Sequence, residues 1–186
     1  RLEDIYNFED ALLVGSMLIT FLRHCDRIKI ACLAQLVNVI APIFTQTGGG
    51  IFAQTIFYPF EHLSNFGRGV ALNPIISSPK YDCKAYTDVP FLESIATFDE
   101  ENEEMTVFCV NKSMNEGMTL DVNLLDFDGY KPFEFISMDG YDKNDVNSFE
   151  NPFVKPHNNP LPEFDDKTLT AQIKPFSWNV IRLKKM

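Results

Sequence analysis

TLDVNL (Thr119–Leu124) alternates polar with apolar residues, and LTAQIK (Leu169–Lys174) repeats that alternation further along the chain. Successive side chains of a β-strand point to opposite faces, so this pattern predicts strands with one buried and one solvated face. Strands of that kind are typical of antiparallel sheets, which often expose one face to water. The two stretches therefore predict an antiparallel all-β region.

The residues around these strands continue the pattern of short predicted strands and turns across 70–186. An acidic turn, Asp99–Glu104, separates two apolar runs and predicts a hairpin. The stretch Asp139–Asp166 is rich in Asn, Pro and Asp and is the expected long loop. Short strands separated by such turns favour a β-sandwich. The further strands predicted are Leu92–Phe98, Met105–Asn111, Tyr130–Met138 and Trp178–Leu183.

Residues 1–69 have a different sequence pattern, in which helices are predicted. The first predicted helix covers Asn7–Cys25. Asn7 is a favoured N-cap, and the acidic Glu9 and Asp10 follow in the first turn, where the helix dipole stabilises carboxylates. Apolar residues then recur at helical spacing. The small Gly15 at the centre would let this helix lie close against a sheet.

An apolar run, Ile28–Ala34, follows and predicts a strand buried on both faces, as in parallel sheets. Gly48–Gly50 breaks the chain before a second predicted helix, Thr55–Phe66, which Gly67 would cap. Helix, parallel strand, loop and helix make a piece of an α/β barrel or of a doubly wound sheet, too short to close either. The expected fold class is α/β plus all-β, divided at about residue 69 into 1–69 and 70–186.

Composition and charge exclude several classes of function. The chain has 186 residues, 26 Asp and Glu against 16 Lys and Arg, and a formal net charge of −10. Nucleic acid is not an expected partner, because phosphate binding needs concentrated Lys and Arg. No apolar stretch approaches the roughly 20 residues of a membrane helix, so no membrane association is expected.

The four cysteines predict a reducing compartment. They form no CxxC pair, and Cys32 and Cys109 lie in apolar, strand-like surroundings, so we interpret them as buried free thiols. The start of the chain resembles no secretion signal, and a cytoplasmic location is expected. Because the chain begins at Arg1 without a methionine, we expect it to be the middle-to-end portion of a longer protein.

Gln35 is the candidate ligand-binding residue. It directly follows the predicted strand Ile28–Ala34, and the carboxyl ends of barrel strands face the active site. An amide there can donate to and accept from sugar hydroxyls. The alternative, at even odds from position alone, is that Gln35 and the nearby Asn38 hydrogen-bond the loop backbone.

Other motifs receive structural interpretations. His24, His62 and His157 have no metal-ligand spacing and are expected to pack or cap, and no metal or cofactor is expected. Asp126 and Asp128 before a glycine lack the rest of a calcium loop and predict a turn. We expect the Glu100–Glu104 cluster to be a solvated hairpin tip. We expect Gly48–Gly50 to be a flexible loop rather than a phosphate-binding loop. Aromatic residues on loops, such as Phe52, are expected to line a cleft.

Three long runs resemble the C-terminal part of the α-L-arabinofuranosidases of glycoside hydrolase family 51. They are DIYNFEDALLVGSMLITFLRHCDRIKIACLAQLVNVIAPI (Asp4–Ile43), QTIFYPFEHLSNFGRGVAL (Gln54–Leu72) and SWNVIRL (Ser177–Leu183). SSPKYD (Ser77–Asp82) and DVPFLESIA (Asp88–Ala96) are also similar to the family. The resemblance covers nearly the whole chain and weakens only across about 139–166.

The resemblance implies a (β/α)8 TIM barrel followed by a jelly-roll β-sandwich, with residues 1–69 as the last helix-strand-helix portion of the barrel. The implied activity is release of terminal arabinofuranosyl units from arabinan or arabinoxylan oligosaccharides with retention of configuration. Retention needs two carboxyl groups about 5 to 5.5 Å apart. Because the family carries both glutamates upstream, Glu3, Glu9 and Glu61 are not assigned catalytic roles, and the chain contains no catalytic residue.

The resemblance also bears on binding and assembly. Gln35, within CLAQLVN, matches the family's glutamine that hydrogen-bonds the arabinofuranose, and so becomes the expected substrate ligand. Family members often carry Trp where this chain has Phe52. The expected partners are an arabinose-containing oligosaccharide, the upstream barrel portion, which also lends the sandwich a strand, and further copies in a homo-oligomer. The alternatives are a carbohydrate-binding module and a purely structural β-sandwich.

Overall fold

The computed structural model describes residues 3–186. Within that range it contains two helices, α1 (Phe8–Arg23) and α2 (Phe57–Phe66), and thirteen short strands. The strands are β1 (Ile43–Thr45), β2 (Ile51–Ala53), β3 (Val70–Leu72), β4 (Lys80–Tyr81), β5 (Val89–Pro90), β6 (Leu92–Asp99), β7 (Glu104–Asn111), β8 (Met118–Asn123), β9 (Tyr130–Met138), β10 (His157–Asn158), β11 (Glu163–Asp165), β12 (Thr168–Ile173) and β13 (Ser177–Lys185).

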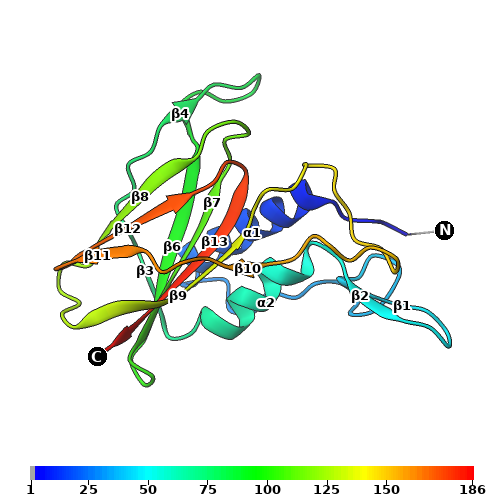
Figure 1. Cartoon of the computed structure of the whole chain (residues 1–186), viewed down its shortest axis with the longest axis horizontal. Helices are drawn as coiled ribbons and strands as arrows, with labels where there is room; N and C mark the ends of the chain where they lie inside the picture. Colours follow the sequence, from blue (N-terminus) through cyan, green and yellow to red (C-terminus); the bar gives the residue numbers. More distant parts are fainter. Residues whose placement is uncertain (1–2) are drawn as a thin grey trace.

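Two antiparallel sheets and a helical layer are stacked on one another (Figure 1). The larger sheet has the order β10-β9-β13-β7-β6-β3, and the smaller has the order β11-β12-β8. The smaller sheet covers one face of the larger, while α1 and α2 cover the other (Figure 1). The protein is therefore mostly β, and the predicted β-sandwich is formed with helices on its outer face.

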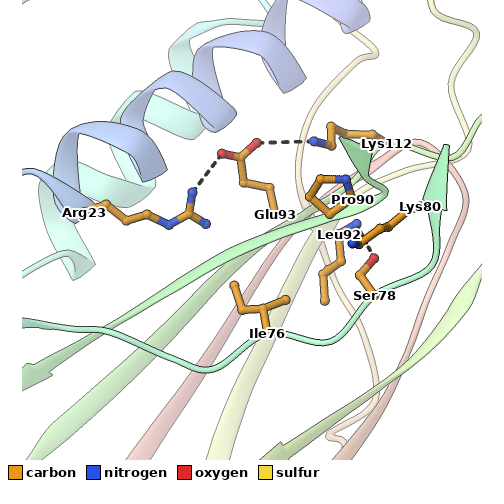
Figure 2. A pocket seen from close by; sticks show the side chains of 8 residues that line it. All are labelled: Arg23, Ile76, Ser78, Lys80, Pro90, Leu92, Glu93 and Lys112. Carbon is orange, nitrogen blue, oxygen red and sulfur yellow. Dashed lines mark hydrogen bonds and ion pairs between the residues drawn. The ribbon is translucent and has the colours of Figure 1, made fainter. Parts of the chain in front are cut away.

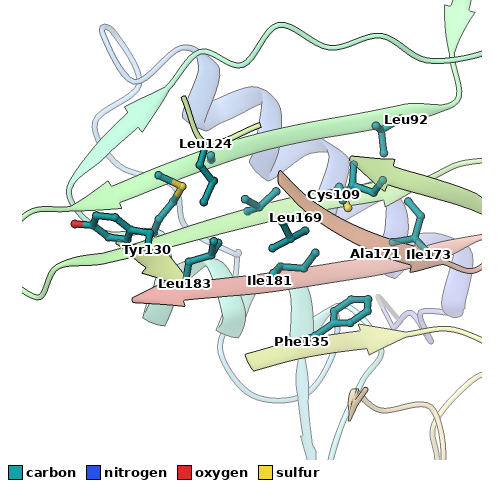
Figure 3. Close-up of a cluster of buried hydrophobic side chains, with 14 residues drawn as sticks. Leu92, Cys109, Leu124, Tyr130, Phe135, Leu169, Ala171, Ile173, Ile181 and Leu183 are labelled. Carbon is teal, nitrogen blue, oxygen red and sulfur yellow. The ribbon is translucent and has the colours of Figure 1, made fainter. Parts of the chain in front are cut away.

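The core between the sheets confirms the alternation seen in the sequence. Leu169, Ala171 and Ile173 of β12 point inward, toward Ile181 and Leu183 of β13 (Figure 3). The intervening polar residues of β12 pair across the ladder with polar residues of β8 on the outer face. Burial of one face of each strand is what selects this register, because a slip of one residue would turn every apolar side chain to solvent.

A second core joins α1 to the larger sheet. Phe8, Leu12 and Ile19 of α1 pack with Trp178 and Val180 on the β13 face opposite the inter-sheet core. β13 is therefore buried on both faces, and the polar residues in its first half are buried together with the apolar ones. Residues on either side of position 69 share this core.

The centre of α1 lies against the ring of Trp178. A Cβ atom placed on Gly15 would be 2.7 Å from Cε3 of Trp178, closer than side chains tolerate. The close approach predicted for Gly15 is confirmed, although the sheet it meets is the antiparallel sandwich sheet rather than a parallel one.

Both helices begin and end close to the predicted positions. Asn7 is the N-cap of α1 and forms a capping box with Asp10, in which each side chain accepts from the other residue's backbone N–H. Gly67 caps the C-terminus of α2. Neither helix within residues 3–186 combines the length and hydropathy needed to cross a bilayer.

The predicted parallel strand over Ile28–Ala34 is wrong for this chain. The segment is irregular and largely exposed, and the exposed fraction of Ile30 is 82%. A central strand needs hydrogen-bonding neighbours on both edges and apolar layers on both faces. No described residue supplies them, so the run stays unpaired, and Cys32 is exposed rather than buried as predicted.

Candidate functional site

Gln35 lies in the irregular segment that leads from the end of α1 to β1. Its backbone adopts the left-handed conformation with φ +59°, and the residue is exposed. Among residues 3–186 its side-chain amide has no hydrogen-bond partner. Gln35 thus does not bond the loop backbone, and both its amide donors and its acceptor are available to a ligand.

Asn38 takes the other of the two predicted roles. Its Oδ1 accepts from the backbone N–H of Thr45 at 2.8 Å, and its Nδ2 donates to Oγ1 of Thr45 at 3.1 Å. The backbone N–H of Asn38 donates to the carbonyl of Ile43 at 2.8 Å. The side chain and backbone of Asn38 therefore tie the segment to β1, and the structural interpretation holds for this residue.

Three further side chains or backbone groups fix the loop that follows. Gln54, only 1% exposed, donates from Nε2 to the carbonyl of Ala41 at 2.8 Å and accepts at Oε1 from the N–H of Tyr6 at 2.9 Å. The Tyr6 hydroxyl donates to the carbonyl of Ile40, and the backbone N–H of Asp4 donates to the carbonyl of Val39. Burial raises the pKa of Tyr6 above its ordinary value, so its hydroxyl remains a donor.

Sequence reasoning missed Gln54. A lone glutamine before a helix carries no sequence pattern, and only the approach of three distant segments makes it a buried connector. Thr55 plays a similar part, because its hydroxyl lies within hydrogen-bonding distance of the carbonyls of Tyr6 and Asn7. The loop after Gln35 is thereby held to the start of α1.

The hairpin β1–β2 continues from this loop and is covered by aromatic rings. Phe44 and Phe52 stack with ring centroids 5.5 Å apart, and Phe149 meets Phe52 edge-on at 4.8 Å. Phe52 is only 8% exposed. Its predicted role in lining a cleft is therefore not supported within residues 3–186, since its ring is used in packing. Gly48–Gly50 forms the connection of the hairpin, with Gly48 at φ +67°.

The long loop between β9 and β10 reaches back to the end of β2 and the start of α1. Asn147, 2% exposed, donates from Nδ2 to the carbonyls of Ala53 and Val154 and accepts at Oδ1 from the N–H of Val154. Val146 forms an isolated antiparallel bridge with Asn7, at the start of α1. Residues far apart in the sequence thus support one end of the molecule, where α1 begins and β1–β2 lies.

Two of the three histidines pack or cap, as predicted, and the exposed His157 does neither. His24 is the C-cap of α1. His62 is buried and accepts at Nδ1 from the indole N–H of Trp178 at 3.0 Å, and burial lowers the pKa of His62 to about 4. His157 faces the carboxylate of Asp139 at 3.5 Å. No group of three potential metal ligands occurs within the described part of the chain.

The acidic motifs also have structural partners. Asp126 and Asp128 lie in a turn, as predicted, and Asp128 pairs with Lys167. Glu104 corrects the expectation of a solvated cluster, because it binds Arg182 at 2.7 Å and Lys184 at 3.3 Å. The cause is tertiary: β13 lies beside β7 and brings its basic residues to the end of the hairpin.

A shallow pocket of about 390 Å³ lies near the other end of α1 (Figure 2). Glu93 binds both Arg23 at 3.3 Å and Lys112 at 3.7 Å within it. Arg23 is the last residue of the 16-residue α1, about 24 Å along the axis from the end that holds the Gln35 loop. Glu93 carries one negative charge against the two positive charges of Arg23 and Lys112, and the pocket is separate from the Gln35 site.

The arrangement of the helices, the sandwich and the Gln35 loop matches known proteins. A profile of the α-L-arabinofuranosidase C-terminal domain matches residues 1–177. The chain belongs to this family. An intracellular exo-α-(1→5)-L-arabinofuranosidase 1 of Bacillus subtilis is 53% identical over 184 residues, which are 99% of this chain and 37% of that protein. The corresponding enzyme of Acetivibrio thermocellus is 50% identical over 185 residues, with the same coverage of both chains.

Solved structures of α-L-arabinofuranosidases agree with the fold. AbfB, a family 51 α-L-arabinofuranosidase from Bifidobacterium longum, superposes with a TM-score of 0.88 at 37% identity, over 97% of this chain and 36% of that one. The arabinose complex of the Thermotoga maritima enzyme superposes with a TM-score of 0.84 over 99% of this chain and 40% of that one, and at 22% identity it shows the fold alone. The chain spans a little over a third of the length of the relatives it matches.

Proposed function

We propose that this chain is the C-terminal portion of a retaining α-L-arabinofuranosidase that acts in the cytoplasm. The enzyme removes terminal non-reducing arabinofuranosyl units from arabinan or arabinoxylan oligosaccharides. Supporting this proposal, relatives at 50 to 54% identity are named as intracellular exo-α-(1→5)-L-arabinofuranosidases. The partners are the sugar substrate and the upstream barrel portion of the same enzyme.

The proposal divides the chain into residues 1–69, the end of a (β/α)8 barrel, and residues 70–186, a jelly-roll sandwich. Its support is the unpaired apolar run Ile28–Ala34, which has the sequence of a central barrel strand but lacks neighbours within residues 3–186. Leu13 and Met17, on the side of α1 away from the sandwich, are 58% and 48% exposed. Upstream barrel strands and helices would bury both surfaces.

Gln35 is the substrate ligand in this proposal, and its unpartnered amide is the observation that carries the assignment. The residue stands at the carboxyl end of the proposed barrel strand, on the face where barrel enzymes bind substrate. Its amide would donate to one sugar hydroxyl and accept from another. Hydrogen bonds between Asn38 and Thr45 and from Gln54 to Ala41 hold the loop that follows Gln35, and none of them uses the Gln35 amide.

The chemistry itself belongs to residues upstream of this chain. A retaining glycosidase uses one carboxylate as nucleophile and a second carboxyl group as acid and then base. Glu9 lies in the first turn of α1, beside the N-cap, and Glu61 lies on α2, where burial raises its pKa. Neither is assigned a catalytic role, and no cofactor or metal is required.

The decisive experiment replaces Gln35 by Ala in the enzyme that joins this chain to its barrel portion. Loss of the sugar hydrogen bonds should lower kcat/KM by roughly 10- to 100-fold on an aryl arabinofuranoside. Gln46→Ala is the matched control, because Gln46 is an exposed glutamine in the β1–β2 turn, and it should leave kcat/KM unchanged. An unchanged kcat/KM for Gln35→Ala would remove the proposed binding role.

We also propose that the full enzyme is a homo-oligomer and that the sandwich braces the barrel. The carbohydrate-binding alternative has less support, because the exposed aromatic side chains among the described residues come from separate loops: Tyr86 from one, and Phe149 and Phe153 from another. Light scattering on the full enzyme should give a mass of several chains, whereas a monomer would contradict the oligomer. Arabinan-affinity electrophoresis of this chain should show no retardation.

A further inference from the structure

We infer that Asn38 is a positioning residue for Gln35: it fixes the place from which the Gln35 amide meets the sugar. The inference rests on the proposed substrate-binding role of Gln35. It comes from the contrast between the two amides, one of which is fully engaged while the other is free.

The backbone around Asn38 makes a sharp reversal. Asn38 and Val39 both adopt the left-handed conformation, with φ +61° and +65°. Asn tolerates that conformation, whereas for the β-branched Val39 it is strained and persists only where neighbouring contacts impose it. The reversal brings Val37 beside Ile43, where the two form a parallel bridge.

The side chain of Asn38 locks this reversal. Oδ1 and Nδ2 engage the backbone N–H and the hydroxyl of Thr45, so a single residue of β1 satisfies both ends of the amide. The carbonyl of Asn38 accepts from the N–H of Ala41 at 3.0 Å. β1 is in turn paired with β2 and covered by the rings of Phe44 and Phe52.

Gln35 has no comparable anchor. No hydrogen bond to another described residue holds its side chain, and it lies three residues before Asn38. The nearest fixed points on its C-terminal side are the Val37 bridge and the Asn38 amide. A loss of the Asn38–Thr45 contact should therefore increase the mobility of Gln35. This would weaken the hydrogen bonds between the Gln35 amide and the sugar hydroxyls, although both groups are still present.

A double-mutant cycle in the enzyme that joins this chain to its barrel portion tests the inference. Asn38→Gly keeps the left-handed backbone accessible and removes only the amide. Asn38→Gly should lower kcat/KM roughly tenfold when Gln35 is present and by less than about twofold in the Gln35→Ala enzyme. Asn38→Asp retains the acceptor for the Thr45 N–H and should recover most of the loss.

The outcomes separate the inference from the proposed function. If Gln35→Ala leaves kcat/KM unchanged, the binding role fails and the inference fails with it. If Gln35→Ala is impaired while Asn38→Gly lowers kcat/KM by the same factor in both backgrounds, Asn38 affects the fold alone and only the inference is overturned. A lowered thermal midpoint with additive kinetics is the signature of that merely structural role.

A second variant covers the case in which Asn38→Gly does not fold. Thr45→Val removes the hydroxyl that accepts from Nδ2 and keeps the backbone N–H for Oδ1. It should lower kcat/KM roughly threefold in the presence of Gln35 and leave the Gln35→Ala enzyme unchanged. Equal effects in the two backgrounds would overturn the inference.

Discussion

α1 and the segment Ile28–Ala34 lie close together in the sequence and are both rich in apolar residues, yet one is buried and the other exposed. α1 places Phe8 and Ile19, both 0% exposed, against the larger sheet. Ile30, by contrast, is 82% exposed. An apolar pattern in the sequence therefore shows only that a segment can be buried. Whether the segment forms a helix or a strand depends on whether another part of the protein packs against it.

The two segments also differ in how much of their structure is local. α1 has a capping box, helical spacing and intrahelical hydrogen bonds, so much of it is specified by its own residues. A strand has no hydrogen bonds within itself, and its backbone groups must pair with at least one neighbouring strand. Ile28–Ala34 finds no such ladder among the described residues.

The largest expected effect comes from removing the partner of α1. Trp178→Ala should lower the free energy of unfolding of this chain by about 3 to 5 kcal/mol, because it empties a fully buried site beneath Gly15 and leaves His62 without its donor. Urea unfolding followed by far-UV circular dichroism measures this loss. Tryptophan fluorescence cannot follow the variant, because Trp178 is the single tryptophan of the chain.

Leu13→Ala is the matched control for that experiment. Leu13 lies on the same helix but is 58% exposed, so its replacement should change the free energy of unfolding by less than about 1 kcal/mol. Equal losses for the two variants would contradict the assignment of α1's buried face.

A smaller effect should appear as a pH dependence of the same contact. Burial lowers the pKa of His62 to about 4, from its ordinary value of 6.5. Between those pH values the unfolded chain binds the proton and the folded chain does not, so stability is full above about pH 6.5 and falls as the pH drops. His62 should account for a loss of about 3 kcal/mol by pH 4.

His62→Gln isolates that contribution, because glutamine offers an acceptor to the Trp178 indole and does not titrate. The difference in unfolding free energy between the parent chain and His62→Gln should shrink or reverse from pH 7 to pH 4. A difference that is constant across this range would show that His62 does not titrate through the unfolding transition.

The smallest effect is expected at the exposed segment. Ile30→Ser should change the free energy of unfolding of this chain by less than about 0.5 kcal/mol, since the side chain already meets solvent. In the enzyme that includes the barrel portion the same change should cost about 2 to 5 kcal/mol, the loss typical of a buried aliphatic side chain. A large loss in this chain alone would mean that Ile30 has a partner within it.

Much of the fold is legible in the sequence where the information is local or periodic. The helix behind Asn7, the Leu92–Asn111 hairpin and the strand Tyr130–Met138 all form within a few residues of their predicted bounds. The structure differs from the expectations for Glu104 and Phe52 for the same physical reason. Each looks like a loop residue in sequence, and each is engaged by residues distant in the chain, Arg182 for one and Phe149 for the other.

The candidate site divides in the same way. Gln35 follows from its position after an apolar run and from family resemblance, whereas the roles of Asn38 and Gln54 needed the tertiary structure. An amide side chain looks the same in the sequence whether it binds a ligand, holds a loop by hydrogen bonds or joins three segments. Its hydrogen-bond partners distinguish these roles, and they are Thr45 for Asn38 and the backbone of Tyr6 and Ala41 for Gln54.

The sequence by itself determined the antiparallel strands, the two helices, the acidic surface and the family, because alternation, helical spacing, capping residues and motif order are properties of the chain. The tertiary structure decided which sheet α1 packs on, which polar groups are paired, and that Ile28–Ala34 stays unpaired. Burial and hydrogen bonding are relations between distant residues, and a strand or an amide acquires its role from the neighbour it meets.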